Sequence, residues 1–158
     1  MKFKHFQFLK NEAIKKLTAL EQEPLRLRNR TIEECLSADA VMLAYIGDAV
    51  YSMYVRERVV QMNITKVQIL HTIVTEFICA KSQAKVLLEI EDTFTEEEEA
   101  IARRARNSNV NVPKSSTVQE YRSSTAFEAV LGFLYETRQE ERLQHIMGQA
   151  FLITLRGM

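Results

Sequence analysis

Residues 40–51 read Ala40-Val41-Met42-Leu43-Ala44-Tyr45-Ile46-Gly47-Asp48-Ala49-Val50-Tyr51. This run is apolar almost all round at helical spacing, so it predicts a central, buried helix that extends over about residues 39–61. A single acidic residue, Asp48, interrupts it. A carboxylate in an apolar setting is costly unless a cation or a hydrogen-bond donor satisfies it.

A second acid, Glu128, has the same kind of setting. Residues 124–134 read Ser124-Thr125-Ala126-Phe127-Glu128-Ala129-Val130-Leu131-Gly132-Phe133-Leu134. Two carboxylates on two such helices predict a shared magnesium site, because Mg²⁺ takes one or two protein carboxylates and completes its coordination with water and phosphate. Small or hydroxylic neighbours favour room for the ion: Ala44, Gly47, Ser124 and Thr125. The alternative is that each acid pairs with an arginine or caps a helix.

The composition is that of one helical domain. The chain has 158 residues, 46% apolar and 27% charged, with only four Gly and two Pro, which favours long helices over many short strands. It has no apolar stretch of membrane-spanning length and no signal-peptide core, so we expect a cytoplasmic protein without a membrane partner. Cys35 and Cys79 are solitary, which favours two buried free thiols over zinc or a disulfide.

Capping patterns predict where the helices begin. The Ser/Thr-x-x-Glu/Gln spacing occurs at Thr31 with Glu34, Thr65 with Gln68, Thr95 with Glu98 and Ser116 with Gln119. These pairs predict helices over about 33–37, 66–90, 96–107 and 117–136, and a last helix covers about 139–155. Residues 107–116 are polar and contain Pro113, so we expect a loop there. No segment alternates as a strand does, and the predicted fold class is all-α.

Charge is distributed unevenly along a chain whose net charge is zero. Residues 1–30 carry eight Lys or Arg against three Glu, and residues 103–122 carry five against one. Local basic segments in a neutral chain suit a protein that meets phosphate on one face. The acidic run Glu96–Glu99 is interpreted as the start of a helix, with Glu99 pairing with Arg103 four residues later.

Several ordered motifs resemble the ribonuclease III catalytic-domain family. Tyr45–Val50 is similar to its signature motif, and Phe127–Gly132 is similar to its second acidic motif. The resemblance is closer to the Mini-ribonuclease III family, which lacks a double-stranded-RNA-binding domain. Three further segments carry it, namely Ala80–Ala84, Arg103–Asn107 and Tyr121–Ala129.

The resemblance covers about residues 38–155 and implies a helical, homodimeric endonuclease. In that family each protomer supplies one magnesium site, the two sites cut opposite strands of double-stranded RNA, and the substrate is the large-subunit (23S) ribosomal RNA precursor. Ribonuclease III enzymes with a full set of acids carry acidic residues at the positions of Val41, Ala44 and Thr125. Mini-ribonuclease III has the same smaller number of acidic residues, so their absence here supports the narrower family. The resemblance also implies weak magnesium binding.

These observations define the expected domains and site. Residues 1–36 form a basic, aromatic extension, either an added helix that packs on the domain or an arm that meets RNA, and residues 37–158 form the catalytic domain. Asp48 and Glu128 are the expected catalytic residues and metal ligands. The residues expected to contact RNA are Lys81, Gln83, Arg103, Arg104, Arg106, Asn107, Lys114 and Arg122. A ribosomal protein is an additional candidate partner.

Two rival functions stay open at this point. One is a non-catalytic RNA-binding or ribosome-associated module on the same fold, which would keep the basic face without needing Asp48 and Glu128. The other is a helical interaction protein in which the basic residues 103–122 form a solvated face.

Overall fold

The structure, a computed structural model, describes residues 2–19 and 29–158. Its elements are α1 (Phe3–Thr18), α2 (Ile32–Ser37), α3 (Ala40–Val60), α4 (Val67–Ile78), α5 (Ala80–Ile90), the short 3-10 helix η2 (Glu91–Thr93), α6 (Glu96–Arg106), α7 (Val118–Glu136) and α8 (Glu140–Arg156). The described ranges contain no strand, so the all-α prediction is confirmed. The predicted loop over 107–116 is confirmed as well.

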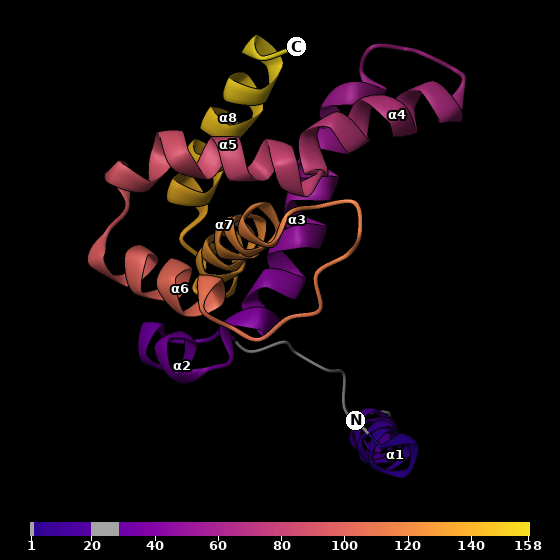
Figure 1. The fold of residues 1–158 in the computed structure, drawn as a ribbon, viewed down its shortest axis with the longest axis vertical. Helices are drawn as coiled ribbons and strands as arrows, with labels where there is room; N and C mark the ends of the chain where they lie inside the picture. Colours follow the sequence, from indigo (N-terminus) through magenta and orange to yellow (C-terminus); the bar gives the residue numbers. More distant parts are fainter. Residues whose placement is uncertain (1, 20–28) are drawn as a thin grey trace.

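Helix α7 is the centre of the domain. Figure 1 shows it nearly end-on, with α3, α5 and α6 around it. Ten of its residues are buried, all of them between Ser124 and Leu134. The sequence pattern assigned the central position to α3, and that prediction is wrong in part. Helix α3 packs on α7 with one side only, and the other side exposes Met42, Tyr45, Met53 and Val60.

Two glycines allow α3 and α7 to cross with their backbones in contact. A Cβ atom added to Gly47 would lie 1.7 Å from the carbonyl oxygen of Glu128, and one added to Gly132 would lie 1.8 Å from the carbonyl oxygen of Leu43. No side chain fits at such distances. The sequence suggested that Gly47 leaves room for a metal ion. That interpretation is wrong, because the backbone of α7 fills the space beside Gly47.

One predicted helix is divided in two. The expected helix over 66–90 breaks at Cys79, whose backbone is extended (φ −68°, ψ 152°) and ends α4 while beginning α5. The Cys79 Sγ lies 3.2 Å from the Ser82 Oγ, within the first turn of α5. No Gly or Pro marks the break in the sequence, so tertiary packing decides it: α4 packs mainly against α3, and α5 packs mainly against α7.

The predicted helix starts are confirmed at two capping boxes and corrected at two. Thr31 with Glu34 and Thr95 with Glu98 form both reciprocal bonds. The box before α7 is formed by Thr117 with Glu120, one residue later than predicted. The box predicted at Thr65 does not form, because α4 begins after Lys66, which makes no side-chain cap bond.

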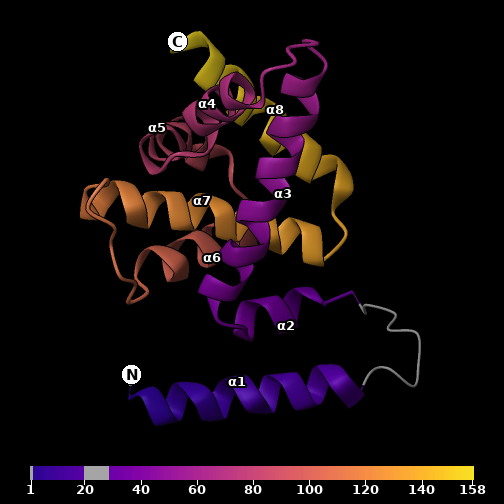
Figure 2. The same ribbon diagram turned by 90° about the vertical axis from the view of Figure 1, so that its right-hand side faces the viewer.

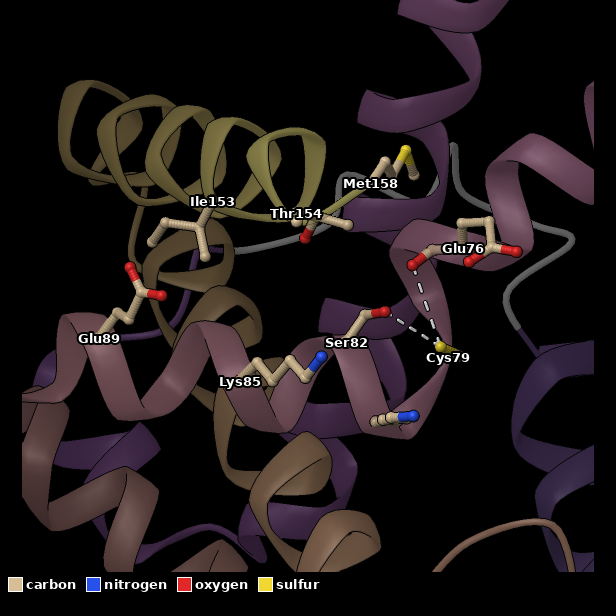
Figure 3. A pocket seen from close by; sticks show the side chains of 10 residues that line it. Glu76, Cys79, Ser82, Lys85, Glu89, Ile153, Thr154 and Met158 are labelled. Atoms are coloured by element: carbon tan, nitrogen blue, oxygen red, sulfur yellow. Dashed lines mark hydrogen bonds between the residues drawn. The ribbon is translucent and has the colours of Figure 1, made fainter.

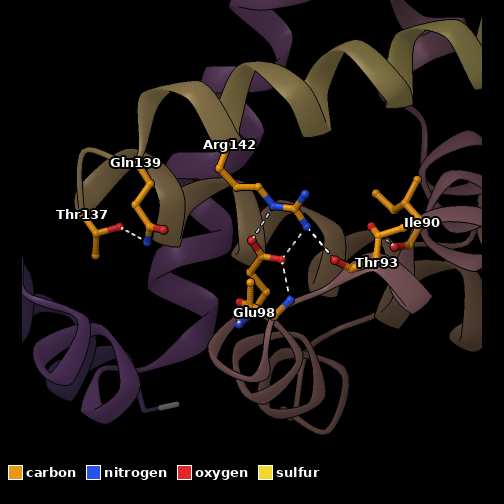
Figure 4. A network of polar contacts seen from close by, with 7 residues as sticks. Ile90, Thr93, Glu98, Thr137, Gln139 and Arg142 are labelled. Carbon is orange, nitrogen blue, oxygen red and sulfur yellow. Dashed lines mark hydrogen bonds and ion pairs between the residues drawn. The ribbon is translucent and has the colours of Figure 1, made fainter.

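Glu98 also holds α6 to α8 through a buried ion pair. Its side chain is only 1% exposed, and the Arg142 guanidinium donates to both of its carboxylate oxygens at 2.8 and 2.9 Å (Figure 4). Arg142 also donates to the Thr93 carbonyl at 2.8 Å. The ion pair predicted between Glu99 and Arg103 is not among those formed by the described residues.

The N-terminal extension contains a helix that stands apart from the domain. Figure 2 shows α1 beyond α2, away from the central helices. It has no buried residue, and Phe3, Phe6 and Leu17 are more than half exposed. Two arginines that add to the positive charge of residues 1–30, Arg26 and Arg28, lie outside the described residues. Among the described helices none is long and apolar enough to cross a membrane.

Candidate active site

The crossing of α3 and α7 brings Asp48 and Glu128 together. Asp48 follows Gly47, the residue that touches the backbone of Glu128. Asp48 is exposed, whereas Glu128 is half-buried. The burial inferred for both acids from their apolar runs is therefore correct only for Glu128, because Asp48 lies on the solvent side of α3.

The two carboxylates repel each other. Burial raises the pKa of Glu128 to about 8, the negative charge of Asp48 adds to the rise, and the Gln83 side chain opposes it. Partial desolvation also raises the pKa of Asp48. Two acids whose pKa values are raised at one point of the surface form a site that a cation would stabilise.

The donor chemistry fits magnesium. Both side chains offer hard carboxylate oxygens, and Mg²⁺ commonly uses one or two of these with water and phosphate at its other positions. Among the described residues no group of three or more His, Cys, Asp or Glu could hold a metal ion. The site therefore fits an ion held by two protein ligands, open to solvent on the side of Asp48.

The hydroxyl neighbours of Glu128 have structural partners. The Ser124 and Thr125 side chains are buried, and their hydroxyls donate to the Tyr121 carbonyl at 2.8 and 2.9 Å. Ala44 is buried too. Open space at the site thus comes from the exposure of Asp48 and not from these small residues, which corrects the interpretation made from the sequence.

Five of the eight residues expected to meet RNA are exposed: Lys81, Arg103, Asn107, Lys114 and Arg122. They come from α5, from the end of α6, from the following loop and from α7, the helix that carries Glu128. The four cations among them form no ion pair with any residue in the described ranges. Their charges are therefore available to a phosphate backbone.

The other three residues of that set have partners or positions inside the protein. Arg104 donates to the carbonyl oxygens of Leu36 and Ala38, which fastens α6 to the end of α2. Arg106 lies 3.3 Å from a Glu91 carboxylate oxygen. Gln83 is 1% exposed. Arg104 and Arg106 are therefore occupied by the fold itself, and Gln83 lies too deep to touch a duplex directly.

Lys85 lies near Lys81 on α5 and was not among the residues predicted from the sequence. Lys81 and Lys85 line a hollow of about 610 Å³ between α5 and the end of α8. Figure 3 shows Lys85 and Glu89 on α5 opposite Ile153 and Thr154 on α8. The i, i+4 spacing of the two lysines on one helix was the available signal. Neither Asp48 nor Glu128 lines this hollow, so it is separate from the acidic pair.

A helical fold with two carboxylates paired at the α3–α7 crossing is the architecture of a ribonuclease III domain. The sequence model of the ribonuclease III domain family matches residues 41–139 of this chain. Similar proteins include Mini-ribonuclease 3 of Thermoanaerobacter sp. (strain X514), 44% identical over 74% of this chain and 83% of the relative, and that of Streptococcus pneumoniae, 42% identical over 69% and 88%. A crystal structure from Fusobacterium nucleatum is 32% identical, with a TM-score of 0.68 over 71% of this chain and 92% of that one. The chain belongs to the Mini-ribonuclease 3 family and is an endoribonuclease of the ribonuclease III type.

Proposed function

We propose that the protein is a magnesium-dependent endoribonuclease that cleaves double-stranded RNA, with Asp48 and Glu128 as its catalytic and metal-binding residues. The observation that carries the proposal is the pairing of the two carboxylates at the α3–α7 crossing, where the charge of Asp48 raises the pKa of Glu128. A pair of mutually repelling acids is maintained at a cost to stability, which a site for a cation explains and a purely structural role does not.

Different residues of the chain are proposed to bind the cation and to set the position of the two acids. Asp48 and Glu128 would be the residues that hold the cation where the scissile phosphate binds. Magnesium, when bound, neutralises phosphate charge and makes an attacking water more acidic. The backbone contact at Gly47 fixes the separation of the two acids, because neither α3 nor α7 can slide without a clash.

The exposed cations Lys81, Arg103, Lys114 and Arg122 are proposed to contact phosphates of the duplex, with Asn107 beside them. Such contacts recognise A-form RNA by shape and charge and carry no base sequence. Replacing Arg103, Lys114 and Arg122 together with Ala is expected to weaken binding equally for unrelated duplexes and to flatten the dependence on salt. The matched control is replacement of Arg56, Lys66 and Arg156, three exposed cations outside the proposed RNA face, with Ala. Unchanged binding by the first variant would exclude this face.

A homodimer is proposed because cutting both strands in one encounter needs two sites at a fixed separation. The structure supplies a surface for it. Met42, Tyr45, Met53 and Val60 are between 54% and 81% exposed along one side of α3, and Asp48 lies on the same helix. Phe77, Phe133 and Leu134 are buried in the core and cannot contribute to such a surface.

A hollow beside the exposed apolar side of α3 supports a two-fold interface. It has a volume of about 420 Å³, and Ala49, Met53, Tyr54 and Tyr135 are among its lining residues. Tyr45 is 81% exposed one turn before Ala49, and a two-fold pair that packs along this side of α3 would bury it together with the hollow. Sedimentation equilibrium at micromolar concentration tests the dimer: about twice 18.3 kDa is expected, and a Tyr45→Arg variant should sediment as a monomer. A wild-type mass of 18.3 kDa would exclude the dimer.

The substrate proposed from the family is the 23S ribosomal RNA precursor, and the proposed location is the cytoplasm, with a ribosomal protein as a further candidate partner. Incubation of the pure protein with duplex or single-stranded RNA, with and without Mg²⁺, tests the activity. Cleavage of the duplex only with Mg²⁺ is expected. Binding without cleavage under every condition would favour the rival, a non-catalytic RNA-binding module.

A further inference from the structure

A buried glutamine lies beside the acidic pair without a hydrogen-bond partner. Gln83 is 1% exposed, and neither its amide oxygen nor its amide nitrogen has a partner of ordinary geometry among the described residues. A buried amide left in this state costs free energy, so cores normally avoid it or satisfy it. Gln83 therefore calls for an explanation other than packing, since an apolar side chain of the same size would stabilise the core better.

The position of Gln83 relates it to Glu128. Helix α5 packs mainly against α7, and both residues lie on those two helices. The Gln83 side chain lies close enough to lower the pKa of the Glu128 carboxyl, although no hydrogen bond of regular geometry joins them. Gln83 and Glu128 are therefore neighbours, and the Gln83 amide makes no hydrogen bond among the described residues.

We propose that Gln83 is a positioning residue, whose amide NH₂ donates to one Glu128 carboxylate oxygen when that carboxylate binds the cation, leaving the other oxygen for the ion. This inference rests on the proposed function of Glu128. Groups that hydrogen-bond to a metal ligand fix its orientation, and losing them typically weakens metal affinity or activity by about 10- to 100-fold. A glutamine can do this without adding charge, whereas an arginine would compete with the cation for the same carboxylate.

The direction of the stability change separates this role from a structural one. In Gln83→Met the volume is nearly preserved and the amide is lost. If the amide serves only Glu128, the variant removes an unsatisfied buried group, and we expect its melting temperature without metal to equal or exceed that of the wild type. A glutamine that held the core together would give a lower melting temperature. The matched control is Gln149→Met, the same replacement at an exposed position on α8.

The experiment measures the affinity for Mg²⁺ by calorimetry and by the metal-induced rise in melting temperature, with duplex cleavage measured in parallel. Gln83→Met is expected to bind Mg²⁺ about 10- to 100-fold more weakly, to need correspondingly more Mg²⁺ for cleavage, and to fold at least as stably as the wild type. Gln149→Met should match the wild type throughout.

Two results would overturn the inference about Gln83 alone: unchanged Mg²⁺ affinity in a folded Gln83→Met variant, or a melting temperature without metal below that of the wild type. The wild-type arm tests the underlying function separately. A wild type that neither binds Mg²⁺ nor cleaves the duplex would overturn the proposed function, and the inference with it, before any variant is compared.

Discussion

The Glu128→Gln variant should be more stable than the wild-type protein at neutral and alkaline pH in the absence of metal. The reason is the pKa of Glu128, which burial and the charge of Asp48 raise from its ordinary value of 4.5 to about 8. The folded protein therefore holds this proton more tightly than the unfolded chain does. The stability gained from the protonated form is complete below pH 4.5 and is lost as the pH rises to about 8.

The size of the effect follows from that difference. At about 1.4 kcal/mol for each tenfold change in proton affinity, the ceiling is about 5 kcal/mol. Glu128 is only half-buried, so local relaxation and water reduce the cost, and about 2 kcal/mol is a realistic expectation. Glutamine imitates the protonated acid at nearly equal volume. For a chain of this length the gain corresponds to a rise of about 4–8 °C in melting temperature at pH 8.

Thermal and urea unfolding between pH 4.5 and 8.5, in EDTA, measure the effect. The wild type should lose stability with rising pH, and Glu128→Gln should lose much less. Glu57→Gln, at an exposed position on α3, is the matched control and should follow the wild type. Added Mg²⁺ should stabilise the wild type at pH 8 and not the variant. A Glu128→Gln variant less stable than the wild type at pH 8 would refute the reasoning, because it would show that the carboxylate is satisfied by the protein itself.

Two further predictions concern the framework that holds the acids. Gly47→Ala should destabilise the fold by about 3 kcal/mol or more, since its Cβ would lie 1.7 Å from the Glu128 carbonyl oxygen. Gly148→Ala is the control, because its nearest contact, the Tyr54 hydroxyl, would lie at an ordinary van der Waals distance of 3.6 Å. Equal urea midpoints for the two variants would contradict the close crossing. Arg142→Met should lower the free energy of unfolding by about 3 kcal/mol, because it leaves the buried Glu98 carboxylate without its cation. The control, Arg156→Met at the exposed end of α8, should lower it little. An Arg142→Met variant as stable as the wild type would show that the Thr95 cap alone satisfies Glu98.

Local sequence signals predicted most of the helices and the identity of the acidic pair. Thr95 with Glu98 fixed one helix start correctly because a capping box depends on four adjacent residues only. The break at Cys79 was not predictable in this way, because packing against two different helices decides it and no Gly or Pro marks it. The exposure of Asp48 was missed for a similar reason. The apolar pattern of α3 does not show which side of the helix packs on α7 and which side stays exposed.

The basic residues show the same limit. Charge and spacing indicated a basic segment over 103–122, but only the three-dimensional contacts separate Arg104, which holds the end of α2, from the exposed Arg103. Gln83 was assigned to the RNA surface from its motif, and the structure buries it beside Glu128. Sequence thus predicted the candidate residues, and packing separated the buried or paired ones from those that are exposed.

Cleavage of an end-labelled RNA duplex by the wild type and by Asp48→Asn, at equal concentrations in Mg²⁺, tests the central claim most directly. Asp48 is exposed, so the variant should fold normally and bind the duplex, which circular dichroism and a gel-shift assay in parallel can verify. The removal of a ligand charge at nearly constant volume is expected to abolish cleavage. Cleavage by folded Asp48→Asn at the wild-type rate would contradict the assignment of the Asp48–Glu128 pair as the catalytic centre.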